Sequence, residues 1–168
     1  MKYQELLKIN SEFKKIKSKI DFKTVVLSNI TTFQINEILE YYLRIDSTHA
    51  SVISGNFNNI VKDSFKYKES DLIIIFWELC DLIEGLYYKI ELFDEQQVES
   101  IFEKTCNEIG LVISNLENSS LVFFNTFSAL PFTISSQEEN NFEKLAKRLN
   151  QHIIKIFPSN VKLINIDN

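Results

Sequence analysis

The 168-residue chain contains little glycine and little histidine, and each shortage excludes a kind of site. Its glycines are Gly55, Gly85 and Gly110, so it contains neither a G-x-G-x-x-G turn nor a P-loop, the common glycine-rich phosphate cradles. It has no Asp-x-Asp pair, which excludes a phosphotransferase site built on an aspartyl nucleophile. Its two histidines, His49 and His152, lie too far apart for the spacing of a metal site. We therefore expect no metal and no cofactor.

Features of secreted and membrane-spanning proteins are also missing. Cys80 and Cys106 are too few for a disulfide framework, and we expect both to be reduced and buried. No run approaches the roughly eighteen apolar residues that a membrane span requires, and the basic N-terminus leads into no signal-peptide core. These absences favour a cytoplasmic location without membrane contact. The net charge of −5 argues against nucleic acid as a general partner.

The charge is distributed unevenly along the chain. Residues 1–23 contain seven lysines against Glu5, Glu12 and Asp21, a net of +4, so the remainder carries −9. A run of this kind is more often the solvated face of a helix than a contact with an acidic carrier protein or a phosphate. We favour the solvated face, and the contact remains the alternative.

Residues 1–20 have the pattern of an amphipathic helix. Spacings of three and four place on one stripe Leu6, Ile9, Phe13, Ile16 and Ile20. The stripe is expected to pack against a sheet layer or against a partner. Helix-mediated oligomerisation is therefore one functional hypothesis, and the oligomeric state is left open.

Residues 21–168 alternate between strand and helix patterns and are expected to form one α/β domain. The apolar run of Val25, Val26 and Leu27 is typical of a strand buried on both faces of a parallel sheet. Further strands are expected at 49–56, 71–76, 121–124 and 161–166, with a last helix after a capping box at Ser136 and Glu139. This order predicts a five-stranded parallel sheet with helices on both faces, in a three-layer α/β/α arrangement. Because the pattern closes on a strand, we expect part of a longer polypeptide.

Polar residues follow the ends of these strands. In an open α/β sheet the carboxyl edge is where ligands bind. Ser28 is the candidate catalytic nucleophile, although the segment 28–32 is equally typical of a helix cap. The candidate substrate-binding residues are Asn29, Thr31, Gly55, Asn56, Glu78, Asp81, Asn125 and Asp167.

Serine catalysis needs a base that accepts the hydroxyl proton and an acid that orients the base. His49 precedes the second strand and is expected at the amino edge, opposite Ser28. His152 falls within the last helix pattern, beside the sheet. A structural role is favoured for both histidines, and Asp81 or Asp167 remains as a candidate base.

Three segments of the chain resemble the N-terminal domain of FkbH-like proteins. They read FKTVVLSNITTFQINEILEYYL, VISGNFNNIVKD and SDLIIIFWELCDL, and the resemblance extends over residues 19–168. Proteins of this family join an SGNH-hydrolase-like domain to a HAD-superfamily domain and occur in polyketide and surface-polysaccharide pathways. The resemblance implies a flavodoxin-like fold of the SGNH-hydrolase type, with an extra N-terminal helix here.

The same resemblance implies roles for particular positions. Ser28 stands at or beside the nucleophile position, without the usual Gly-Asp-Ser, and Gly55 resembles a glycine whose backbone N–H helps to bind the oxyanion. The third block, usually Gly-x-Asn-Asp, reads Glu78, Leu79, Cys80, Asp81, so an oxyanion donor is missing. In the family, the HAD domain is implicated in loading a glyceryl unit onto an acyl carrier protein.

We therefore expect a non-catalytic recognition or docking domain of a biosynthetic protein. Its expected partner is an acyl carrier protein or the HAD domain of the same polypeptide. The alternatives are an SGNH-type esterase or acyltransferase that uses Ser28, and a helix-mediated oligomerisation module.

Overall fold

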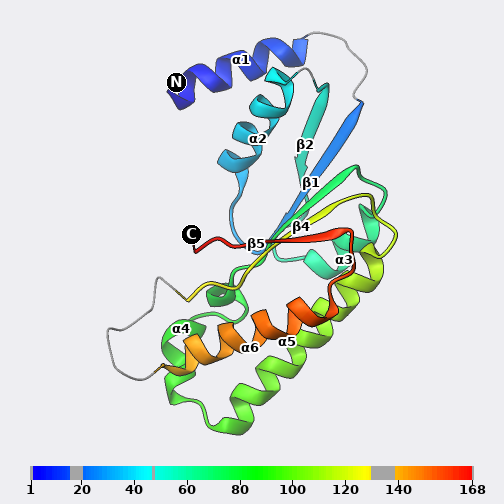
Figure 1. The fold of residues 1–168 in the computed structure, drawn as a ribbon. Coiled ribbons are helices and arrows are strands. Elements are labelled where there is room, and N and C mark those ends of the chain that lie inside the picture. The colour runs from blue at the N-terminus through cyan, green and yellow to red at the C-terminus, as the bar shows by residue number, and fades with distance from the viewer. Residues whose placement is uncertain (1, 16–20, 47, 130–138, 168) are drawn as a thin grey trace.

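The structure, a computed structural model, describes residues 2–15, 21–46, 48–129 and 139–167 and contains a five-stranded sheet (Figure 1). All neighbouring strands are parallel, in the order β2-β1-β3-β4-β5. This order is that of a flavodoxin-like fold, as expected. The strands are β1 (Phe22–Ser28), β2 (Ala50–Ser54), β3 (Leu72–Phe76), β4 (Val122–Asn125) and β5 (Val161–Ile164).

Helices lie on both sides of the sheet and complete the three-layer architecture. Figure 1 shows α1 and α2 on one side and α3, α5 and α6 on the other. No helix in the described ranges has the length and apolar character needed to cross a membrane. The helices are α1 (Tyr3–Lys15), α2 (Phe33–Ile45), α3 (Ile60–Lys66), α4 (Leu86–Lys89), α5 (Glu95–Leu116) and α6 (Asn141–Ile156), with short 3-10 turns at Leu79–Asp81 and Ile90–Leu92.

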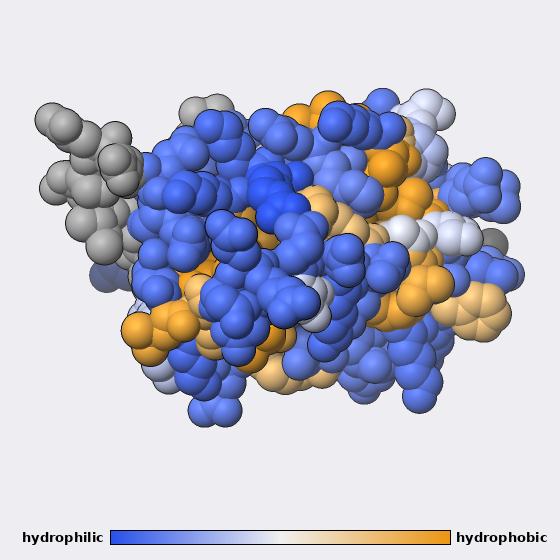
Figure 2. Space-filling model, turned by 90° about the horizontal axis from the view of Figure 1, so that it is seen from below, coloured by the Kyte–Doolittle hydropathy of each residue, from blue (hydrophilic) through white to orange (hydrophobic). Residues whose placement is uncertain are grey.

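The two faces of the sheet bury cores of different size. Because side chains alternate along a strand, Val25 and Ile73 belong to the larger core under α3, α5 and α6, whereas Val26 and Ile74 belong to the smaller core beside α2. Burial on both faces explains why the central strands are apolar at consecutive positions. The outer surface of α4, α5 and α6 is mostly hydrophilic, with apolar residues in separate patches (Figure 2).

Two expectations from the sequence were wrong in detail. The last helix does not begin at the expected capping box; Ser136 lies outside the described residues, and the box that caps α6 is formed by Asn140 and Glu143. Here the Asn140 side chain accepts from the Glu143 N–H, and the Glu143 carboxylate accepts from the Asn140 N–H, each at 2.8 Å. Cys80 and Cys106 are free thiols, as expected, but are only partly buried.

Helix α1 packs against α2 through charged groups as well as apolar ones. The Glu40 carboxylate is buried and pairs with Lys14 at 3.0 Å and with Arg44 at 2.7 Å. The Asn10 amide donates to the backbone oxygen of Glu37, and Arg44 donates to the backbone oxygen of Asn10. Leu6 is the buried apolar residue of α1. The N-terminal helix is thus held on α2 by a network centred on a buried carboxylate.

Replacing Glu40 with alanine should therefore destabilise the fold. The change removes a buried partner and leaves the mostly buried Arg44 guanidinium without its carboxylate. We expect the free energy of unfolding in urea to fall by about 3 kcal/mol. Glu12→Ala, which removes an exposed carboxylate from α1, is the matched control and should change it little. Equal effects of the two substitutions would contradict the role assigned to Glu40.

Candidate functional site at the carboxyl edge

Ser28 ends β1 at the carboxyl edge, but its hydroxyl is bonded to the backbone. The hydroxyl donates to the Ile30 carbonyl at 2.7 Å, and Ser28 is only 7% exposed. His49 lies just before β2, at the amino edge, and His152 lies within α6, its ring 6.3 Å from that of Phe102. Both histidines are thus placed as expected. In the described part of the chain, no histidine is positioned to take the Ser28 proton.

Asn29 and Asn125 hold the backbone that follows β3. The Asn29 amide accepts from the Glu78 N–H at 2.7 Å and donates to the Glu78 carbonyl at 2.8 Å. The Asn125 amide accepts from the Trp77 N–H at 2.7 Å and donates to the Trp77 carbonyl at 3.2 Å. The two asparagines are 1% and 2% exposed. Their side chains are therefore used to satisfy buried peptide groups, which would be costly to leave unpaired.

Gly55 and Asn56 form the turn after β2, which is organised by Asp63. The buried Asp63 carboxylate accepts from the Asn56 backbone N–H and from the Asn56 and Asn59 side-chain amides. The Gly55 N–H donates to the Val26 carbonyl at 2.8 Å. This N–H is consequently engaged in the sheet, at the position where the resemblance to a hydrolase implies an oxyanion donor.

Three carboxylates gather beyond the ends of β3 and β5. Burial raises the pKa of Glu78, and the negative charges of Asp81 and Asp167 raise it further. The pKa of the Cys80 thiol is likewise raised, first by its burial and then by Asp81 and Glu78. A raised pKa keeps this cysteine in the thiol form, which is a poor nucleophile. Within the described residues there is no His, Cys, Asp and Glu group suited to holding a metal ion.

The structure thus brings most of the candidate residues to one edge but joins them in separate clusters. Asn29 and Asn125 flank the end of β3, the three carboxylates lie beyond it, and Asn56 belongs to the Asp63 turn. Thr31 is exposed in the loop before α2. A cavity of about 350 Å³ lies nearby between the start of α3, Trp77 and α5, and none of the candidate residues lines it.

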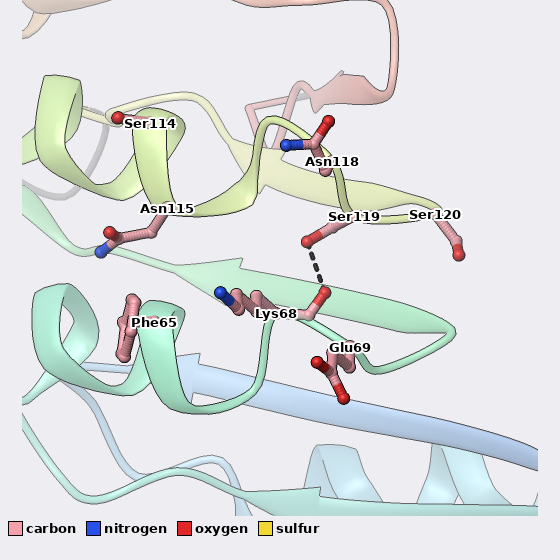
Figure 3. A pocket seen from close by; sticks show the side chains of 8 residues that line it. All are labelled: Phe65, Lys68, Glu69, Ser114, Asn115, Asn118, Ser119 and Ser120. Carbon is pink, nitrogen blue, oxygen red and sulfur yellow. Dashed lines mark hydrogen bonds between the residues drawn. The ribbon is translucent and has the colours of Figure 1, made fainter.

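A second cavity, also of about 350 Å³, lies at the opposite, amino edge (Figure 3). Phe65 lies on α3 and Lys68 just after it, and they face residues from the end of α5. The Ser119 hydroxyl donates to the Lys68 carbonyl at 2.7 Å, and the Asn115 amide donates to the Ser64 hydroxyl at 2.9 Å. These hydrogen bonds connect α3 and the residues after it to the end of α5 beside the cavity.

Sequence reasoning missed Asp63, the residue on which the β2–α3 turn depends. The available indication was its place in the first turn of α3, where acidic side chains are favoured. It also missed the Thr126–Asn165 contact, in which the Thr126 hydroxyl donates to the Asn165 side chain at 3.4 Å between the ends of β4 and β5. Thr126 and Asn165 stand in loops whose polar composition gives no sign of this contact.

One solved structure with a similar fold is the N-terminal part of the protein BF1531 from Bacteroides fragilis, described as containing a phosphatase domain complexed with Mg. The TM-score is 0.67 at 13% sequence identity. The likeness covers 99% of this chain but 45% of the other, so this chain spans less than half of that protein's structure. No family model matches the sequence, and no curated protein matches it. The likeness shows that the two proteins share the α/β fold.

We expect Gly55→Ala to destabilise the protein through the turn after β2. A Cβ atom at this position would lie 2.7 Å from the Leu27 side chain and 2.8 Å from the Asp63 carboxylate, so one of them must move. Overpacking of this kind costs about 1–3 kcal/mol of unfolding free energy, measurable in urea.

The matched control is Gly110→Ala in α5, where a Cβ atom would meet nothing within 4 Å. Because alanine is the better helix former, this control should raise the free energy of unfolding by up to about 1 kcal/mol. A fall in the free energy of unfolding for Gly55→Ala together with a rise for Gly110→Ala would support the close approach at Gly55. A gain of stability at both positions would contradict it.

Proposed function

We propose that this chain is a non-catalytic, SGNH-like recognition or docking domain of an FkbH-like protein in polyketide or polysaccharide biosynthesis. The observation that carries the proposal is that the polar groups of the carboxyl edge are engaged in internal hydrogen bonds. The Ser28 hydroxyl donates to the backbone, and so does the Gly55 N–H. The groups that correspond by resemblance to a nucleophile and an oxyanion donor therefore serve the fold, which favours binding over hydrolysis.

The surface around the same edge supports docking. Aromatic side chains are exposed in three connections that leave the carboxyl ends of strands: Phe33 after β1, Phe57 after β2, and Tyr87 and Tyr88 after β3. Phe57 is 69% exposed. Aromatic residues are enriched at the centres of protein interfaces because they bury a large area at a small cost in side-chain entropy. We take this set of aromatic residues as the docking surface.

The proposed partner is a HAD-type phosphatase domain of the same polypeptide, and an acyl carrier protein is the second candidate. The comparison supports the first, since the solved structure of similar fold is described as containing a phosphatase domain and extends well beyond the part that this chain matches. We also propose that the protein is located in the cytoplasm.

An esterase or acyltransferase that uses Ser28 is the competing function. Its support is the position of Ser28, at the carboxyl end of a central strand where ligands bind in open α/β sheets. The two functions differ in whether the Ser28 oxygen can be activated as a nucleophile.

Fluorophosphonate labelling, followed by intact-protein mass, should give no adduct on the wild type or on Ser28→Ala. The physical reason is that neither histidine of the chain is positioned to take the hydroxyl proton and that the hydroxyl is bonded to the Ile30 carbonyl. A known serine hydrolase in the same reaction shows that the probe is active. An adduct that forms on the wild type and vanishes in Ser28→Ala would establish the hydrolase instead.

The docking arm of the same test is a titration followed by backbone NMR. The added partners are an FkbH-like phosphatase domain and, separately, an acyl carrier protein. Binding should perturb the carboxyl-edge loops, and Phe57→Ala or Tyr88→Ala should weaken it by about tenfold. Phe65→Ala, at the amino edge, is the control with an equally exposed ring. Perturbation confined to the amino edge, or none with either partner, would overturn the docking proposal.

A further inference from the structure

Helix α2 turns a row of apolar side chains toward solvent. The row consists of Ile35, Ile38, Tyr42 and Ile45, which are all exposed to solvent, Ile38 at 40% and Tyr42 at 60%. Their spacings of three, four and three place them on one face of the helix, as at the a and d positions of a coiled coil. An apolar row of this kind on an amphipathic helix ordinarily packs against the rest of the protein.

The charged side chains of α2 lie on the opposite, inner side. Glu40 is buried in its pairs with Lys14 and Arg44, and Glu37 accepts from Asn10 and Lys14 of α1. Helix α1 therefore covers the polar side of α2 and leaves the apolar row free. No charged residue interrupts the row, so its chemistry fits another apolar helix surface.

The two ends of α2 differ in charge: the start has the partial positive charge of a helix N-terminus, and Asp46 at the other end is negative. At the start, Thr32 makes no capping hydrogen bond with its side chain, so the first backbone N–H groups of the helix lack that partner. At the other end, Asp46 is exposed, and among the described residues no ion pair involves it. A helix N-terminus attracts negative charge, and a carboxylate at a C-terminus is unfavourable there.

We propose that a second copy of this chain covers the row, in a two-fold dimer in which the two α2 helices pack antiparallel. The 13-residue helix is about 20 Å long, so a crossing centred between Ile38 and Tyr42 brings each Asp46 to the start of the other α2. Because the dimer is two-fold symmetric, the contact between Asp46 and the start of the other α2 occurs twice. Parallel packing would instead place the two Asp46 carboxylates together. The inference rests on different observations from the proposed function, although Phe33 of the docking surface is the first residue of α2 and would lie near the Asp46 of the other copy.

Sedimentation velocity of the full chain, from micromolar to several hundred micromolar, tests the dimer. The wild type should change from monomer to dimer over this range, and the double substitution of Ile38→Glu with Tyr42→Glu should remain monomeric. Both residues are exposed, so circular dichroism should show an unchanged fold. The matched control is Ile154→Glu on α6, a still more exposed isoleucine whose substitution should leave the dimer intact.

Asp46→Lys tests the antiparallel arrangement. It places a positive charge beside the positive end of the other α2, and the dissociation constant should rise by roughly 3- to 30-fold at low salt over the two equivalent contacts. A dissociation constant that does not change would overturn the antiparallel arrangement. A wild type that stays monomeric at every concentration would overturn the dimer. A dimer that survives the double substitution would overturn the assigned surface.

Discussion

The carboxyl end of β3 depends on hydrogen bonds from asparagine side chains on both neighbouring strands. Asn29, just after β1, pairs with both peptide groups of Glu78, and Asn125, the last residue of β4, pairs with both peptide groups of Trp77. These amides extend the hydrogen-bond ladder beyond the last residue of the central strand. Without them, buried N–H and C=O groups would lose their partners at the point where the chain leaves the sheet.

This arrangement determines what the edge can do chemically. An amide that satisfies a buried peptide group has its orientation fixed by that group, and only its remaining donor or acceptor capacity is left for a ligand. The same reasoning applies to the Ser28 hydroxyl on Ile30 and to the Gly55 N–H on Val26. The polar residues of the edge therefore serve the fold, and the exposed aromatic side chains of the neighbouring loops are the groups that we propose for recognition.

The fold could be predicted from the sequence because its information is local. Consecutive apolar residues such as Ile73, Ile74 and Ile75 are possible only where both faces of a strand are covered, and this fixes a central position in a parallel sheet. The start of α6 was misplaced, since Ser136–Glu139 and Asn140–Glu143 have the same capping pattern and only tertiary packing distinguishes them.

The sequence predicts where the candidate site residues lie, but it does not predict which groups their side chains bind. Residue type and strand position place Asn29 and Asn125 at the carboxyl edge, but a buried asparagine that binds a ligand and one that binds its own backbone have the same sequence signature. Only the distances distinguish them. The same limit applies to α2, whose period indicates a helix with an apolar face but not the direction in which that face points. In the structure, buried Glu40 pairs with Lys14 of α1, so this side of α2 faces α1, while Leu39 packs against the sheet. The apolar row is consequently exposed to solvent, and an exposed apolar surface of this kind is unfavourable unless an interface covers it.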